Sequence, residues 1–102
     1  MLFRSMLSIV IPVFKEAKNL KILIPKLYYS LKKIKNEIII VDDDSNDGTK
    51  NIIKKYQKKN LRLLIRKKKT KDLSLSCKLG FEKSNYNHIL VMDGDEIGRA
   101  HV

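Results

Sequence analysis

Four short apolar runs recur along the chain and are separated by longer amphipathic stretches. The runs cover residues 7–12, 37–41, 61–65 and 88–92, and they are rich in Ile, Leu and Val. Continuous apolar runs of this length are typical of strands that are buried on both faces of a sheet. We therefore predict four strands, and we expect the third to lie nearer a sheet edge because Arg62 interrupts its apolar character.

The stretches between these runs carry the spacing of one-sided helices. Between residues 16 and 35, apolar side chains recur every three or four positions, and Pro25 inside this stretch predicts a kink or a break. A second helix should begin near Asp47, whose carboxylate can cap it. A third helix is predicted from the spacing of Leu73, Cys77, Gly80 and Phe81. Strands that alternate with helices indicate an α/β domain of the doubly wound type, with a parallel sheet covered on both faces.

The composition is that of one small, folded and strongly basic domain. The 102 residues include 22 Lys or Arg and 11 Asp or Glu, which gives a formal net charge of +11. A hydrophobic content of 43% is enough for a core and argues against a disordered basic tail. Cys77 is the single cysteine of the sequence and cannot form an internal disulfide, and no apolar run approaches the roughly 20 residues of a membrane span. We expect a cytoplasmic protein, and association with the cytosolic face of a membrane stays an open alternative.

Positive charge is concentrated in one third of the chain. Eleven basic residues and no acidic residue fall between Lys50 and Lys71. Such a stretch can bind nucleic-acid phosphates or an anionic membrane, or it can be the solvated face of a helix and a loop. Only Tyr56 offers an aromatic ring for stacking on a base, so we favour the solvated face and expect no nucleic-acid partner.

Two groups of acidic residues follow two of the predicted strands. The groups are Asp42, Asp43, Asp44 and Asp47, and then Asp93, Asp95 and Glu96. Ligands of doubly wound sheets bind at the carboxyl ends of the strands, so both groups and residues 12–16 should share one ligand-binding edge. Asp93 and Asp95, separated by Gly94, suit a Mg²⁺ or Mn²⁺ ion that also takes phosphate oxygens. The glycine-rich phosphate loops of dehydrogenases and P-loop enzymes are absent.

In their order and spacing, the motifs at residues 8–20, 39–49, 72–74 and 91–95 resemble the family-two glycosyltransferases of GT-A fold. Within that family the chain is most similar to the dolichyl- or polyprenyl-phosphate mannosyl- or glucosyltransferases. The resemblance implies that residues 7–95 form the Rossmann-like donor-binding half of a GT-A domain, with about four mostly parallel strands flanked by helices. It also implies a hexosyltransferase that moves a sugar from GDP-mannose or UDP-glucose to a lipid phosphate.

The resemblance further implies roles for single residues. The residues implied to bind the nucleotide sugar are Pro12, Phe14, Glu16, Val41, Asp43, Asp93 and Gly94. Asp93 and Asp95 are the implied catalytic residues, and Asp95 is the implied direct ligand of Mg²⁺ or Mn²⁺. Phe14 stands where the family usually has Tyr, and Asp44 stands where Gly is common.

Residues 96–102 depart from the family pattern and are expected to be a non-native tail. The segment 97–102 can be encoded by ATCGGAAGAGCACACGTC, which resembles a sequencing-adapter read. Because the acceptor-binding half of the family is absent from these residues, we expect the chain alone to be inactive while its longer parent is an enzyme. Two alternatives stay open: a polysaccharide or protein-glycan acceptor, and a basic nucleic-acid-binding module.

Overall fold

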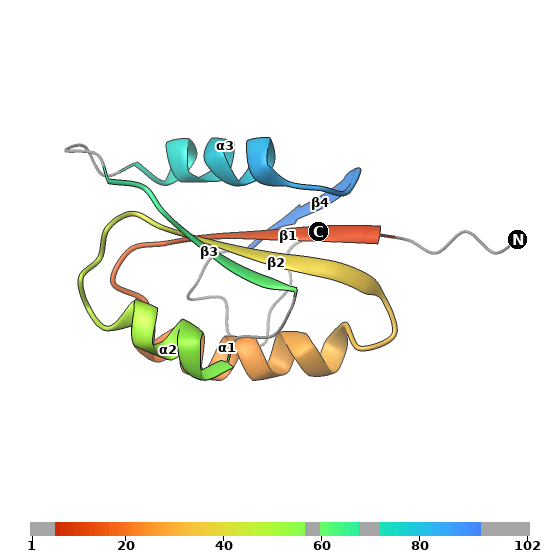
Figure 1. Cartoon of the computed structure of the whole chain (residues 1–102), viewed down its shortest axis with the longest axis horizontal. Helices are drawn as coiled ribbons and strands as arrows, with labels where there is room; N and C mark the ends of the chain where they lie inside the picture. The colour runs from red at the N-terminus through yellow and green to blue at the C-terminus, as the bar shows by residue number, and fades with distance from the viewer. Residues whose placement is uncertain (1–5, 57–59, 68–71, 93–102) are drawn as a thin grey trace, which may run out of the picture.

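The computed structural model describes residues 6–56, 60–67 and 72–92, which form a four-stranded sheet between two helical layers (Figure 1). In chain order the elements are β1 (Met6–Val13), α1 (Ala17–Ser30), β2 (Lys35–Asp42), α2 (Thr49–Tyr56), β3 (Leu61–Ile65), α3 (Leu73–Lys83) and β4 (His88–Val91). All strand pairs are parallel and the strand order is β3-β2-β1-β4. The predicted α/β class and parallel sheet are confirmed, and β3 lies at an edge, as expected.

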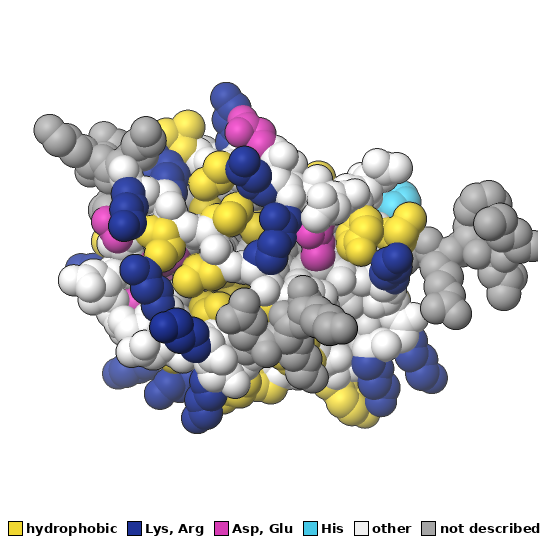
Figure 2. All heavy atoms as spheres, viewed as in Figure 1, with side chains coloured by type: hydrophobic (Ala, Val, Ile, Leu, Met, Phe, Trp, Pro, Cys, Tyr) yellow, Lys and Arg dark blue, Asp and Glu magenta, His cyan; other side chains and the backbone are white. Residues whose placement is uncertain are grey.

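Both faces of the sheet are apolar, and the two central strands alternate between them. Helices α1 and α2 cover one face and α3 covers the other (Figure 1). The strand residues in the larger core, on the α1–α2 face, include Ile9, Ile11, Ile38 and Ile40. The smaller cluster on the α3 face consists of Val10, Ile39 and Val41, with Leu64 and Leu79 against it. The charged side chains lie mainly outside these layers, where Lys and Arg predominate (Figure 2).

Helix α3 approaches β1 closely because its inner face carries small residues. A Cβ atom at Gly80 would lie 2.3 Å from Cγ1 of Val10, so only glycine allows this approach. Ser76, one turn earlier, is fully buried, whereas Phe81 is 44% exposed. The predicted apolar face of this helix is therefore wrong at Phe81, because short side chains rather than large ones face the sheet.

Helix α1 continues through Pro25, so the sequence pattern's alternative of a break at this proline is wrong. The helix ends at Ser30 rather than near residue 35. Proline has no N–H, so the carbonyl of Lys21, four residues earlier, receives no hydrogen bond from residue 25. Because Pro25 is exposed, this carbonyl can accept a hydrogen bond from water instead. Within the described residues, no helix combines the length and the apolar character needed to cross a bilayer.

The strand order places the topological switch point between β1 and β4. From β1 the sheet extends to β2 and β3 on one side, and the chain then returns to β4 on the other. The backbone nitrogen of Met92 donates to the carbonyl of Val10 at 3.0 Å. The next β1 residue whose backbone is directed at β4 is Pro12, which has no N–H, so it cannot donate a further hydrogen bond to β4. Ligands of doubly wound sheets bind at the carboxyl ends of the strands near such a point.

Candidate functional site

The turn that follows β1 is held against the acidic turn that follows β2. The backbone nitrogen of Lys15, a residue with φ 57°, donates to Oγ of Ser45 at 2.7 Å. Pro12 is buried, and Phe14 and Glu16 are half-buried at the same edge. The Nζ atom of Lys15 lies 5.3 Å from the ring centroid of Phe14. The structure therefore brings three predicted donor-binding residues, from the end of β1, next to the acidic turn.

The acidic turn, residues 42–48, is organised by two of its carboxylates. Asp42 accepts hydrogen bonds from the backbone nitrogen and the hydroxyl of Ser45. Asp47 accepts from the nitrogen of Ala17 at 3.2 Å and from the nitrogen and hydroxyl of Thr49 at 3.2 and 2.5 Å. One carboxylate thus stabilises the starts of both α1 and α2, which confirms the predicted cap.

The two carboxylates differ in their electrostatics. Burial raises the pKa of Asp42, and the nearby charges of Asp47 and Asp44 add to this effect, against the hydrogen bonds from Ser45 that lower the pKa. Burial would also raise the pKa of Asp47, but the hydrogen bonds from Thr49 and Ala17 outweigh it and lower the pKa. Asp42 is therefore the carboxylate of this turn whose charged form its surroundings disfavour, whereas the surroundings of Asp47 favour the charged form.

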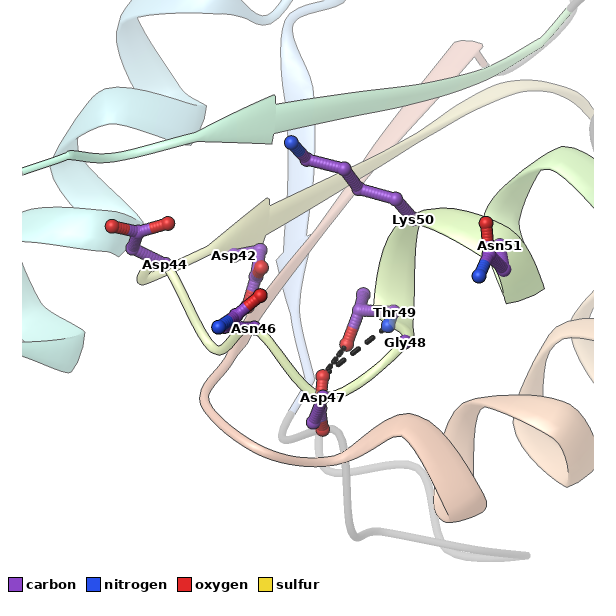
Figure 3. Close-up of a pocket in the computed structure, with 8 residues that line it drawn as sticks. All are labelled: Asp42, Asp44, Asn46, Asp47, Gly48, Thr49, Lys50 and Asn51. Atoms are coloured by element: carbon purple, nitrogen blue, oxygen red, sulfur yellow. Dashed lines mark hydrogen bonds between the residues drawn. The ribbon is translucent and has the colours of Figure 1, made fainter.

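A pocket of about 220 Å³ opens over this turn and the start of α2 (Figure 3). Its lining residues are Asp42, Asp44, Asn46, Asp47, Gly48, Thr49, Lys50 and Asn51. Figure 3 shows Asp47 bonded to Thr49, with Asp44 at the opposite end of the turn. Three residues of the turn, Asp44, Asn46 and Gly48, have positive φ values of 61°, 54° and 90°. The glycine common in the family at position 44 would adopt such a conformation without strain.

Asp43 joins the ends of three strands to the start of α3. Its side chain is 1% exposed, and its two oxygens accept hydrogen bonds at 2.6 Å, one from Nη1 of Arg66 and one from the nitrogen of Asp72. The nitrogen of Asp43 also donates to the carbonyl of Val13 at 2.9 Å, and the nitrogen of Arg66 to the carbonyl of Asp42 at 2.8 Å. The Asp43 carboxylate, which the resemblance implies to bind the nucleotide sugar, is thus enclosed by protein donors.

Arg66 is the residue at this edge that sequence reasoning missed. Arg66 belongs to the basic stretch from Lys50 to Lys71, which is predicted to be a solvated face, but its side chain is only 8% exposed. Arg62 of the same stretch also pairs with a carboxylate, that of Glu37 at 3.0 Å, so the interpretation as a uniformly solvated face is wrong for these two arginines. Lys50, Lys54 and Lys55 are exposed on α2, as expected. A usable signal was present, because Arg66 directly follows a strand at its carboxyl end.

Of the four remaining predicted site residues, one is buried and three lie outside the described residues. Val41 is fully buried beneath α3, so only its backbone lies near the edge. Asp93, Gly94 and Asp95 lie outside the described residues, as does the tail at 96–102. In the part of the chain that is described, no three His, Cys, Asp or Glu side chains gather to hold a metal ion.

Comparison with known proteins identifies the class. The sequence profile of Glycosyl transferase family 2 matches residues 8–97. The chain is 34% identical over 88 residues to a dolichol-phosphate mannosyltransferase of Pyrococcus furiosus, an alignment that covers 86% of this chain and 25% of that protein. It is 31% identical over 96 residues to a dolichol-phosphate mannosyltransferase of Mycosarcoma maydis, covering 86% of this chain and 32% of that protein.

Two solved structures are similar in fold. TarS of S. aureus superposes with a TM-score of 0.78 at 22% identity, over 88% of this chain and 16% of that chain. The mannosyltransferase PcManGT from Pyrobaculum calidifontis, in complex with GDP-Man and Mn²⁺, superposes with a TM-score of 0.76 at 18% identity, over 91% of this chain and 28% of that chain.

The chain therefore belongs to glycosyl transferase family 2, and it has the Rossmann-like GT-A arrangement that the resemblance implied. It spans between 25% and 38% of the length of six curated relatives that it matches.

Proposed function

We propose that this chain forms the donor-binding half of a glycosyltransferase that moves a hexose from a nucleotide-diphosphate sugar to a polyprenyl or dolichyl phosphate. The observation that carries the proposal is the edge at the switch point, where the β1–α1 turn is hydrogen-bonded to the acidic turn and where β4 ends beside β1. The similarity to proteins named dolichol-phosphate mannosyltransferase supports the lipid-phosphate acceptor. The GDP-Man and Mn²⁺ bound to PcManGT support the donor class and the metal.

We assign Mg²⁺ or Mn²⁺ to Asp95, with Asp93 beside the sugar and the nucleotide. Asp42, Asp43 and Asp47 already accept hydrogen bonds from protein donors, which makes them weaker candidates for a metal. A pair of carboxylates around Gly94 offers the oxygen ligands that hard divalent cations prefer. When bound, the ion would offset the charge that develops on the diphosphate leaving group. The phosphate of the acceptor is already anionic, so a strong protein base is unnecessary.

The donor nucleotide is assigned to Pro12, Phe14 and Glu16 on one side and to the end of β2 on the other. Val41 contributes its backbone, since its side chain is buried. Both oxygens of Asp43 already accept a 2.6 Å bond and the side chain is only 1% exposed, so direct contact with the donor would require the residues around it to move. We therefore give Asp43 the additional role of holding the ends of β2 and β3 in place around the base.

The test is calorimetric titration of the 102-residue chain with GDP-mannose and with UDP-glucose, each with and without Mn²⁺. We expect metal-dependent binding of one donor, and we expect Asp95→Asn to weaken it by at least about tenfold, because even residues that only support a metal ligand are worth about 10- to 100-fold. Glu82→Gln is the matched control, since it removes one exposed carboxylate from α3.

Two results would contradict this assignment. One is the absence of metal-dependent binding by a chain whose circular dichroism shows it to be folded. The other is equal binding by the Asp95→Asn and Glu82→Gln variants. A second assay, with dolichyl phosphate added, should give no glycolipid from the 102-residue chain alone, and turnover there would show that these residues suffice for catalysis.

A further inference from the structure

The outer side of α1 carries an apolar ridge that faces solvent. Ile22, Pro25 and Tyr29 are spaced by three and four residues, so they share one stripe of the helix. All three are exposed, Ile22 by 46% and Tyr29 by 72%. The core-facing stripe of the same helix, from Leu20 to Leu27, is separate and buried. Packing among the described residues therefore does not explain why apolar side chains occupy the outer stripe.

Lysines surround this ridge, and acidic residues are absent from the helices that carry it. Neither residues 17–36 nor residues 49–56 contain an Asp or a Glu. Helices α1 and α2 lie on the same face of the sheet, where dark blue and yellow side chains alternate along the lower edge of Figure 2. The exposed lysines of this layer are Lys18, Lys21, Lys26, Lys32, Lys33, Lys50, Lys54 and Lys55. We call these lysines and the ridge together the α1–α2 basic surface.

This arrangement differs from the outer side of α3, where Lys78 and Lys83 alternate with Glu82. Mixed charges of that kind are typical of an ordinary solvated helix. Eight lysines on segments that contain no acid, with Asp47 at the starts of the two helices, would be costly to bury against another protein domain unless that domain supplied matching acids. The α1–α2 basic surface is therefore complementary to a broad, strongly anionic partner.

We propose that the α1–α2 basic surface docks on an anionic lipid bilayer. The ridge enters the headgroup region, which favours an amphipathic ring such as that of Tyr29, and the flanking lysines contact lipid phosphates. The Nζ atom of Lys32 lies 4.4 Å from the ring centroid of Tyr29, so this positive charge and this ring can contact the membrane interface at the same place. A nucleic acid would use the lysines but would leave Ile22 and Pro25 without a partner. The proposal does not depend on the donor or acceptor assigned above.

The test is flotation of the 102-residue chain with two kinds of vesicle, one of phosphatidylcholine alone and one with phosphatidylglycerol as a third of the lipid. Flotation separates bound chain, which rises, from aggregated chain, which sinks. We expect binding only to the anionic vesicles, with loss of binding between about 0.1 and 1 M salt because the screening length shortens from about 10 to 3 Å.

Two double variants separate charge from apolar contact. Lys21→Glu with Lys26→Glu should weaken binding by at least about 25-fold, since each lysine near an anionic surface is worth about fivefold. Ile22→Ser with Tyr29→Ser should weaken it by about tenfold or more through lost apolar burial. Lys78→Glu with Lys83→Glu is the matched control, because it makes the same change in net charge on the opposite layer. Thermal unfolding by circular dichroism checks that each variant is folded.

Several outcomes would overturn the proposal. Failure of the folded wild-type chain to float with anionic vesicles would do so directly. Equal losses in the control and in the Lys21–Lys26 variant would show that net charge, rather than this surface, is responsible. Tighter binding to a single-stranded or duplex RNA, unchanged by the Ile22–Tyr29 variant, would identify a nucleic acid as the partner instead.

Discussion

Glu37 and Asp43 are two buried carboxylates that share the α3 face of the sheet, one at each end of β2. Each pairs with an arginine at the matching end of β3, Glu37 with Arg62 at 3.0 Å and Asp43 with Arg66 at 2.6 Å. Between the two pairs lies the small apolar cluster under α3. An ion pair between an arginine and a buried carboxylate therefore lies at each end of the contact between the sheet and α3, but the surroundings of the two pairs differ.

At the amino end, the carboxylate of Glu37 is fully satisfied. It accepts hydrogen bonds from the hydroxyl of Ser8 at 2.6 Å and from the backbone and side-chain nitrogens of Asn85 at 2.5 and 3.0 Å. Burial would raise the pKa of Glu37, but these bonds and the charge of Arg62 outweigh it and lower the pKa. The pair thereby anchors the connection from α3 to β4.

At the carboxyl end, the chain keeps features that cost stability. The pKa of Asp42 is raised by burial and by neighbouring acids. Among the described residues, the non-glycine residues with positive φ, Lys15, Asp44 and Asn46, all lie at this end. Strained backbone conformations and carboxyl groups with a shifted pKa are common at functional sites. The amino end is thus an anchor, whereas the carboxyl end has the features expected of the proposed binding edge.

The largest expected effect comes from removing each arginine in turn. Arg66→Met should cost about 3–5 kcal/mol, because it leaves the charge of Asp43 buried with one protein donor. Arg62→Met should cost at most about 1 kcal/mol, because its side chain is 38% exposed and Glu37 keeps Ser8 and Asn85. Urea unfolding measures both losses. Similar losses for the two variants would show that the two ion pairs do not differ in the way proposed.

A smaller effect should distinguish the two ends by pH. Because the pKa of Glu37 lies below its ordinary value of 4.5, the charged form favours folding. This contribution is present above pH 4.5 and is lost as the pH falls through the lowered pKa of the folded state. Glu37→Gln should therefore cost about 1–3 kcal/mol at neutral pH, from one unpaired buried donor, and much less in acid.

Asp42→Asn should show the opposite pH dependence. The pKa of Asp42 is raised above its ordinary 3.8, so its contribution to folding is present below pH 3.8 and is lost as the pH rises through the raised pKa. The amide oxygen can still accept from Ser45, so the variant should be near neutral in acid and about 0.5–1 kcal/mol more stable at neutral pH. Urea unfolding across the pH range tests both variants, and pH profiles of the same sign would contradict the comparison.

Sequence reasoning predicted the four strands, the parallel sheet and the edge on which the first acidic group lies, because these follow from periodicity and from the geometry of parallel sheets. It missed both ion pairs. The alignment of Asp42 with Ile65, which brings Asp43 beside Arg66, is a property of strand register, and hydrophobic pattern alone does not determine register between parallel strands. On the inner face of α3 the predicted spacing included Gly80 but missed Ser76, whose hydroxyl side chain carries no apolar signal.

The smallest expected effect tests whether strain at the carboxyl end is a cost to stability. Asp44 adopts φ 61°, a conformation that glycine reaches without a steric penalty, and its charge adds to the raised pKa of Asp42. Asp44→Gly should therefore stabilise the chain by about 0.5–1 kcal/mol, after the greater flexibility of glycine in the unfolded state is subtracted. Asp44→Asn removes the charge and keeps a residue that tolerates positive φ, so it isolates the electrostatic part. Urea midpoints should rank Gly above Asn and Asn above the wild type. If Asp44→Gly were destabilising instead, Asp44 would have a stabilising role in the turn, and strain would no longer separate the two ends of the sheet.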